Sequence, residues 1–421
     1  SVTEFTQKDH HHNLILNLYH EFTWGLGIAF HTVYAVVPLF LKSLGAPNLV
    51  IVSTAGLFAV LMAIPQLFSA LMGRNIKDIK IVALLLHGLP ISAVFMMGTI
   101  YTFLTPTGPN AWIYFYIGFI SYGLGIGYLL PVWVAFIEQS TLKEKRGQFL
   151  GLSFAFHSIG GFVGGFAVKW ILDSAIPFPN NFGIGFYIFF VSITIGSALF
   201  FWFRVKERPN DIPHKTVKEF LADIKDILIG HRNFQKYLLA RIFCVATFPA
   251  VSLYAVYCQN KFNFEMSEAG IFIIINVFAA GMASYLTGKM GDKYGHKLSM
   301  IFSFICHFIA MLLAIYSQSM LWVYTLFFFL GAGLGSFMPA SMNLIYDFSQ
   351  DRDTKTYMAL IDTILAPFVI MSILGASLIR TQFGTEAVFI SVAIFLIIGI
   401  SLLIFVVNEP RTKKQINGFS S

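Results

Sequence analysis

The sequence predicts an all-α membrane protein whose twelve transmembrane helices form two pseudo-symmetric bundles of six. Three observations predict this fold class. The 421 residues are 57% hydrophobic and only 12% charged, whereas soluble domains carry about a quarter charged residues, and their mean hydropathy is +0.72. The apolar residues gather in twelve long, continuous runs. Two motifs of the first half recur, in the same order, in the second half.

The twelve runs are each long enough to cross a bilayer, whose core of about 30 Å needs about 20 apolar residues per helix. Gly, Pro, Asn and charged residues mark the breaks between them. A β-barrel is excluded because the runs are continuous rather than alternating. The predicted spans are 14–42, 49–72, 81–104, 112–136, 148–172, 183–204, 236–258, 266–288, 298–318, 321–346, 356–379 and 386–407.

Basic residues predict the orientation of these spans. With the N-terminus inside, almost all of the 28 Lys and Arg fall in cytoplasmic segments, as the positive-inside rule expects. We therefore expect an integral protein of a bacterial inner (plasma) membrane with both termini cytoplasmic. The net charge of +7 is spread over loops, which gives no reason to expect nucleic-acid binding. Only Lys42, Lys169, Lys261 and Arg380 fall at the opposite ends, and Arg241 lies within a span.

The chain divides into an N-terminal bundle over 1–204, a cytoplasmic linker over 205–235, and a C-terminal bundle with a cytoplasmic tail over 236–421. Within the linker, residues 216–229 (TVKEFLADIKDILI) place apolar side chains at helical spacing, with Lys and Asp on the other face. This pattern predicts an amphipathic helix. It suits the inner membrane surface or a solvated connection between the bundles.

Two motifs indicate that the bundles are an internal repeat. The pattern G-x-G-x-G-x-x-x-P in the fourth span returns 208 residues later in the tenth, and HTVYAVV in the first span returns as VSLYAVY 220 residues later in the seventh. Six helices repeated in one orientation are typical of transporters whose bundles rock about a central site. The first pattern comprises Gly123, Gly125, Gly127 and Pro131, and then Gly331, Gly333, Gly335 and Pro339.

The loop between the eighth and ninth spans carries the most specific motif. Residues 288–297 read GKMGDKYGHK, which resembles the G-x-x-x-D-[RK]-x-G-x-[RK] loop of the major facilitator superfamily. The resemblance covers the whole architecture but identifies no subfamily. It implies a monomeric secondary transporter in which Gly288, Asp292, Lys293 and Gly295 control closure at the inner face. The equivalent first-half loop, 73–78, keeps a glycine and basic charge but loses the spacing.

The same resemblance assigns an inner-face charge network to the ends of the fourth and tenth spans. Its members would be Glu138 and Arg146 in the first half, and Asp347 and Arg352 in the second. In the fifth span, residues 160–165 (GGFVGG) resemble the G-P-x-x-G-G motif of the family's proton antiporters, without its proline. Small residues also pack helices closely in membranes, so a packing role is the alternative. The glycines concerned are Gly160, Gly161, Gly164 and Gly165.

Ionisable groups inside spans suggest the substrate and proton pathway, because such groups are expensive in lipid and usually face the interior. Glu21, Trp24 and His31 lie on one predicted face of the first span. Glu21 corresponds by the 220-residue offset to Arg241. Three interpretations are open: the two pair across the cavity as a switch, they form a permanent ion pair, or each reaches separately to the interface. The other candidates are His157, Tyr254, Asn343 and Asp362, of which Asp362 and His157 are candidate proton carriers.

These observations together predict a transporter rather than an enzyme. No phosphate-cradling loop, nucleophile–base set or zinc spacing is present, so we expect no cofactor and no metal. His10–His12 and the pair Met338 and Met342 would be a weak basis for copper transport. We predict alternating-access transport of a small organic solute, coupled to protons. The alternatives are efflux of lipophilic compounds and a receptor on the same fold that does not transport.

Overall fold

The computed structural model describes residues 4–71, 78–142, 145–206, 216–350 and 354–411. Helices make up its architecture, and none of the elements in these ranges is a β-strand. The elements are α1 (Gln7–Ile28), η1 (Ala29–His31), α2 (Val36–Ser43), α3 (Asn48–Leu71), α4 (Ile79–Thr99), η2 (Ile100–Leu104), α5 (Ala111–Gln139), α6 (Arg146–Asp173), α7 (Asn180–Ala198), η4 (Leu199–Trp202), α8 (Val217–Gly230), α9 (Arg232–Cys244), α10 (Thr247–Phe262), α11 (Glu268–Tyr294), α12 (His296–Tyr316), α13 (Met320–Ser349), α14 (Thr354–Phe383) and α15 (Thr385–Phe405).

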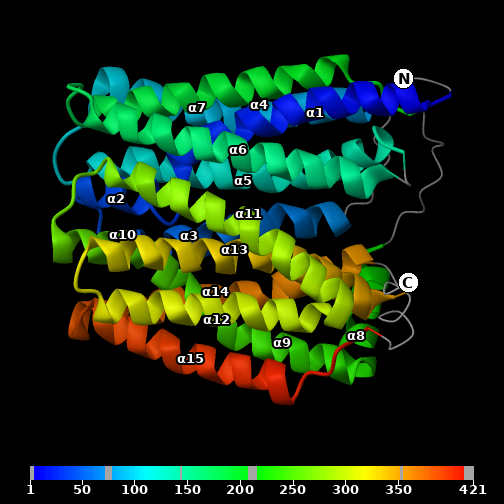
Figure 1. The fold of residues 1–421 in the computed structure, drawn as a ribbon. Coiled ribbons are helices and arrows are strands. Elements are labelled where there is room, and N and C mark those ends of the chain that lie inside the picture. Colours follow the sequence, from blue (N-terminus) through cyan, green and yellow to red (C-terminus); the bar gives the residue numbers. More distant parts are fainter. Residues whose placement is uncertain (1–3, 72–77, 143–144, 207–215, 351–353, 412–421) are drawn as a thin grey trace.

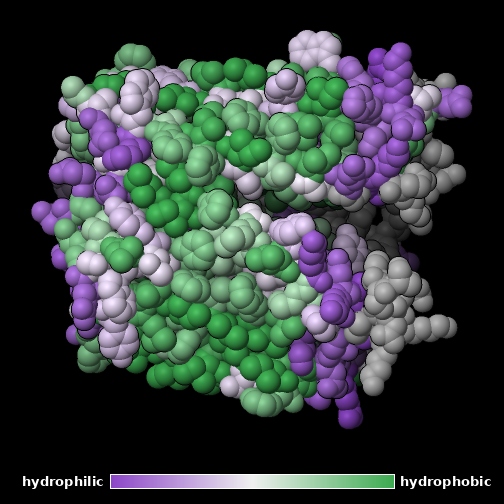
Figure 2. Space-filling view, in the orientation of Figure 1, coloured by the Kyte–Doolittle hydropathy of each residue, from purple (hydrophilic) through white to green (hydrophobic). Residues whose placement is uncertain are grey.

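Twelve of the described helical segments are long and apolar enough to cross a membrane, which confirms the predicted count. The first is bent, because η1 separates α1 from α2, and the seventh is broken between α9 and α10. Figure 2 shows a broad hydrophobic band across one face of the molecule, between hydrophilic rims at the two ends. Helix α1 begins and helix α15 ends at the same rim (Figure 1), which we call the terminal end; the other is the opposite end.

Two helices begin earlier than the predicted starts at residues 14 and 236. Helix α1 starts at Gln7 because Thr6 and Asp9 form a capping box, and α9 starts at Arg232, where the His231 side chain accepts from a backbone N–H. Each residue adds about 1.5 Å, so Glu21 lies about 21 Å along its helix rather than within the first turns. Glu21 therefore lies farther along its helix than the predicted start at residue 14 implied.

The fourth and tenth spans confirm the internal repeat by their contacts. In α5, Gly123 and Gly127 face α3 while Gly125 faces α4. In α13, Gly331 and Gly335 face α11 while Gly333 faces α12. The first and third glycine of each motif thus meet the second helix of their bundle, and the middle glycine meets the third. Equivalent contacts in the two bundles are what a structural repeat requires.

The two bundles meet along a small set of helices. Helix α6 of the first bundle packs on α11 of the second, and α3 packs on α14 and α10. In Figure 1 these helices run through the middle of the molecule, with α1, α4 and α7 on one side and α9, α12 and α15 on the other. The space-filling view shows a recess between the bundles toward the terminal end.

The predicted amphipathic helix of the linker is present as α8. Thr216 and Glu219 form a capping box at its start, and its buried residues are Phe220 and Ile227. Leu221 and Ile229 remain exposed. Helix α8 contacts α14 and α9 of the second bundle. The boundaries at 204 and 235 between bundle and linker stay a prediction.

Candidate functional site

Helix α6 carries four glycines that bring it close to helices of both bundles. Gly160 and Gly164 face α1, where a methyl group on Gly160 would overlap the carbonyl oxygen of Phe22. Gly161 and Gly165 face α11 of the other bundle. Small residues allow backbones to approach in this way in membranes. The glycines therefore make the close contacts that a packing role requires, and they place α6 between the first bundle and α11 of the second.

The α1–α6 contact brings together two predicted site residues, Glu21 and His157. The Nδ1 atom of His157 lies 3.0 Å from Oε2 of Glu21. The Glu21 side chain is 8% exposed, whereas that of His157 is 35% exposed. A carboxylate and an imidazole at this distance can share a proton or form an ion pair. His157 therefore links the buried carboxylate to more open surroundings beside the α6–α11 contact.

Two further histidines extend this pair into the first bundle, and the sequence did not single them out as site residues. Nε2 of His20 lies 3.8 Å from Oε1 of Glu21. The rings of His20 and His87 are 5.7 Å apart, and Trp24 lies 5.8 Å from each of them. Nδ1 of His20 is buried without a hydrogen-bond partner. The usable sequence signal was the His20–Glu21 dipeptide inside a span, where adjacent ionisable groups are rare.

Arg241 lies in the second bundle, away from Glu21. Its Nη1 donates a hydrogen bond of 2.8 Å to the Tyr237 hydroxyl, and its guanidinium stands 4.7 Å from the centre of the Phe337 ring. Glu21 pairs with His157 instead, so the pairing of Glu21 with Arg241 that the repeat suggested is not formed in this structure. The charge of Arg241 reaches Asp362 of α14, with which it interacts electrostatically.

Other predicted cavity residues are distributed between the two bundles. His31 lies inside the first bundle among the rings of α3, α5 and α7, so the expectation that it faces the solute pathway is not met here. Its closest ring is that of Tyr122, at 4.6 Å. Tyr254 is buried against Phe389 of α15. Asn343 is half-buried on α13.

A family model described as the Major Facilitator Superfamily matches residues 22–273 and 237–420. The chain belongs to the major facilitator superfamily. It is an integral membrane protein and a transporter of this superfamily, whose fold and members are those of transporters and not of enzymes.

Two proteins that are similar to this chain in sequence are named as multidrug resistance proteins. The chain is 24% identical over 392 residues to the "Multi-drug resistance efflux pump PmrA homolog" of Lactococcus lactis subsp. lactis (strain IL1403), which covers 89% of this chain and 90% of that protein. It is also 24% identical over 291 residues to "Multidrug resistance protein 2" of Bacillus subtilis (strain 168), with 68% of this chain and 67% of the relative covered.

Solved structures share the fold at low sequence identity. A POT family transporter in complex with 5-aminolevulinic acid matches with a TM-score of 0.72 and 12% identity, covering 94% of this chain and 96% of that one. A D-xylose-proton symporter matches with a TM-score of 0.67 and 13% identity, covering 95% and 98%. These matches confirm two six-helix bundles of the superfamily type.

The superfamily loop motif lies at the terminal end of the second bundle. Gly295 joins α11 to α12 with a φ of 99°, a backbone conformation that glycine adopts readily. Oδ1 of Asp292 lies 3.6 Å from Nε2 of His296. Arg411, beyond α15, donates to the carbonyl oxygens of Gly291 and Asp292. Within the described residues, the loop is thus tied to the end of its own bundle.

The rest of the predicted inner-face network is spread over the two bundles. Arg146 donates to the hydroxyl of Thr141 and to the carbonyl oxygen of Glu138, so it holds the α5–α6 turn. Lys293 stands over the ring of Tyr294. Asp347 has a buried carboxylate oxygen without a hydrogen bond. Gly288 has open space around it. Arg352 and the first-half loop up to residue 77 lie outside the described residues.

Polar contacts between the bundles gather at the opposite end. Lys42 of α2 donates to Gln259 and Asn260 of α10, at 2.7 and 2.6 Å. Asn48 of α3 accepts from Nη1 of Arg380 at 2.6 Å. Its side-chain amide also donates to Ser377 and Thr381 of α14. We call these contacts the opposite-end clamp.

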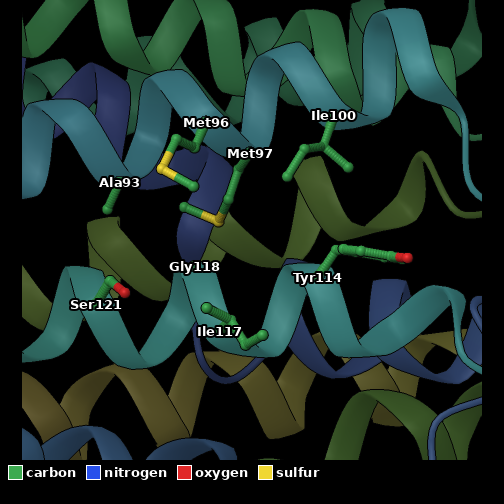
Figure 3. Close-up of a pocket in the computed structure, with 8 residues that line it drawn as sticks. All are labelled: Ala93, Met96, Met97, Ile100, Tyr114, Ile117, Gly118 and Ser121. Carbon is green, nitrogen blue, oxygen red and sulfur yellow. The ribbon is translucent and has the colours of Figure 1, made fainter.

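A separate groove lies on the outer surface between α4 and α5 (Figure 3). It has a volume of about 150 Å³. The exposed side chains of Met96, Tyr114 and Ile117 line it, and Met97 packs over Gly118. The groove opens within the hydrophobic band and holds no ionisable group apart from the Tyr114 phenol. It suits contact with lipid rather than solute recognition.

Two of the three consecutive histidines at the start of α1 have separate hydrogen-bond partners. Nδ1 of His10 accepts from the backbone N–H of Leu142, and Nε2 of His12 lies 3.1 Å from the carbonyl oxygen of Trp202. Among the described residues, no group of three or more His, Cys, Asp or Glu side chains could hold a metal ion.

Proposed function

We propose that the protein is a proton-coupled transporter of a small organic solute, in which Glu21 and His157 carry the coupled proton. The observation that supports this most is the buried Glu21 carboxylate bonded to a partly exposed imidazole. A charge within a membrane span is expensive to keep unless it has a function or a partner. His157 supplies a partner whose imidazole can either accept or donate a proton.

The position of the pair supports coupling to the rocking of the bundles. His157 lies one turn before Gly161, and Gly161 faces Val277 of α11. A shift of α11 along α6 would therefore change the surroundings of the imidazole without breaking the α1–α6 contact. Alternating access requires that the ion site open to one side at a time. The α6–α11 contact would provide this switch.

We further propose that the terminal end is cytoplasmic, following the distribution of basic residues. The structure would then represent an inward-facing state, with the opposite-end clamp closed toward the outside. The protein would act as a monomer in a bacterial inner membrane. Residues 1–204 and 236–421 would move as the two rocking units, joined by the linker with α8.

Efflux of lipophilic compounds is a second candidate for the direction and substrate class. It is supported by two relatives named as multidrug resistance proteins at 24% identity, one of them covering 89% of this chain. The aromatic surroundings of the candidate site agree with an apolar solute. Both candidates share the same proton-coupled cycle and differ in the class of solute and the direction of its transport.

The test uses proteoliposomes with a trapped pH dye. Vesicles are challenged in turn with pools of metabolites and of lipophilic cations, and with the same pools in protein-free vesicles. We expect one pool to produce a protein-dependent pH change, and subdivision of that pool to identify the solute. Solute movement detected by tracer without any pH change would contradict proton coupling while leaving transport intact.

The opposite-end clamp gives a prediction about the conformational equilibrium. Asn48→Ala removes one hydrogen bond from a charged donor and two from the Asn48 amide. Because such bonds contribute about 0.5–3 kcal/mol each, the open population at this end should rise by roughly tenfold or more. The distance between spin labels on Pro47 and Glu265 reports the change.

A matched control exists at the same end. Asn180 also donates to a backbone carbonyl, that of Thr102, but this bond lies within one bundle. Asn180→Ala should leave the label distances unchanged. If the distribution of label distances is also unchanged in Asn48→Ala, the clamp does not hold the bundles together.

A further inference from the structure

Arg241 is a buried cation with few hydrogen-bond partners. It is 8% exposed and lies among α9, α13 and α14. A guanidinium has five N–H donors, yet the hydrogen bond described for this one goes to the Tyr237 hydroxyl. In the described part of the chain, no carboxylate lies within the 4.0 Å of an ion pair with Arg241. Burying a charge without a partner is strongly unfavourable.

Asp362 is the nearest source of negative charge, and it stays apart from Arg241. Its carboxylate feels the charge of Arg241 but forms no hydrogen bond or ion pair with any described residue. It is half-buried on α14 and lies within a span. The two opposite charges are thus near enough to interact, but no hydrogen bond or ion pair joins them. In a transporter, such unpaired polar groups can bind a polar group of the solute.

Two aromatic side chains beside Arg241 make part of its surroundings apolar. The Phe337 ring lies 4.7 Å from the guanidinium and is itself half-buried, whereas Tyr237 is fully buried and orients the guanidinium from behind. Stacking on Phe337 leaves the N–H edge of the guanidinium available. That edge matches a carboxylate in a bidentate arrangement.

We infer that Arg241 binds the anionic group of the transported solute, and that this solute is an organic monoanion with an apolar body. The inference rests on the proposed transport function and adds the substrate class. Asp362 disfavours solutes with more than one negative charge, because its carboxylate repels the second charge. A single carboxylate close to an aromatic or aliphatic body fits between Arg241, Phe337 and Asp362.

The test compares 2-naphthoate with its neutral isostere 2-naphthamide. Binding to the purified full-length protein in detergent is measured by titration calorimetry. Hydrogen bonds from a charged donor predict that naphthoate binds about 10- to 100-fold more tightly than naphthamide. Arg241→Gln should remove this preference. Asp362→Asn should strengthen naphthoate binding several-fold, because the repelling charge is gone, and leave naphthamide unchanged.

Arg204→Gln is the control for the loss of one positive charge. Arg204 forms its ion pair with Asp9 at the terminal end and is 42% exposed, so both probes should bind as in the unmodified protein. Thermal unfolding of each variant checks that the fold is kept, and Arg241→Lys, which keeps the charge, should retain part of the preference.

Several results would overturn the inference. Equal affinity for the two probes, or binding of neither, would exclude an organic-monoanion site, as would a preference that survives in Arg241→Gln. Weaker naphthoate binding in Asp362→Asn would mean that Asp362 supports the anion rather than limiting its charge. Glu21→Gln should keep the preference. In the unmodified protein, a naphthoate preference without any proton flux would count against the proposed function alone.

Discussion

Replacing Glu21 by Gln should abolish solute accumulation driven by a pH gradient, down to the level of protein-free vesicles. Gln keeps the size of the side chain and can still accept a hydrogen bond from His157, but it cannot take up a proton. Because the solute site is separate from this pair, exchange of labelled for unlabelled solute should continue. Tracer uptake with and without a pH gradient measures both activities in the same vesicles.

The control for Glu21 is a second Glu→Gln change far from the pair. Glu386 accepts a hydrogen bond from Tyr257 at the opposite end and is exposed. Glu386→Gln should therefore transport normally, and Glu21→Asp should keep part of the coupled activity. If Glu21→Gln still accumulates solute in response to a pH gradient, the carboxylate is not the proton carrier.

A second large effect is expected from Gly160→Ala in α6. The added methyl group would overlap the carbonyl oxygen of Phe22, a backbone atom next to Glu21 that cannot rotate away. Overpacking of this kind costs about 1–3 kcal/mol, and here it would also separate α1 from α6. The midpoint of thermal unfolding should fall, and gradient-driven transport should be lost with it.

The same helix provides the matched control. Gly151 has no heavy atom within 4 Å of an added methyl group. Gly151→Ala should be neutral or slightly stabilising, because alanine favours a helix over glycine. Equal stability and activity of the two variants would mean that close approach of α1 and α6 is not what holds Glu21 against His157.

The sequence was sufficient to predict the twelve spans and the repeat, because both follow from hydrophobic length and from glycine spacing. Partners within the bundles were harder to predict. The 220-residue offset related Glu21 to Arg241, but symmetry relates equivalent positions and does not bring them into contact. Glu21 meets His157 because glycines on α6 let α1 approach, a contact that depends on tertiary packing.

His31 shows a second limit of sequence reasoning. Helical spacing predicted that it shares a face with Glu21 and Trp24. The chain leaves α-helical geometry at Ala29, where η1 begins, and a helix of three residues per turn carries the following side chains to another direction. His31 therefore turns into the aromatic interior of the first bundle. The residues before His31 carry no proline or other signal that predicts the end of α-helical geometry at Ala29.

Simultaneous measurement of proton and solute flux in the same proteoliposomes tests the central claim most directly. Once the solute is known from the pool experiment, a trapped pH dye and a tracer report the two fluxes over a range of imposed gradients. The account predicts a fixed ratio of protons to solute in the unmodified protein and no proton flux in Glu21→Gln. Solute flux that leaves the internal pH unchanged, or a proton flux that survives in Glu21→Gln, would contradict it.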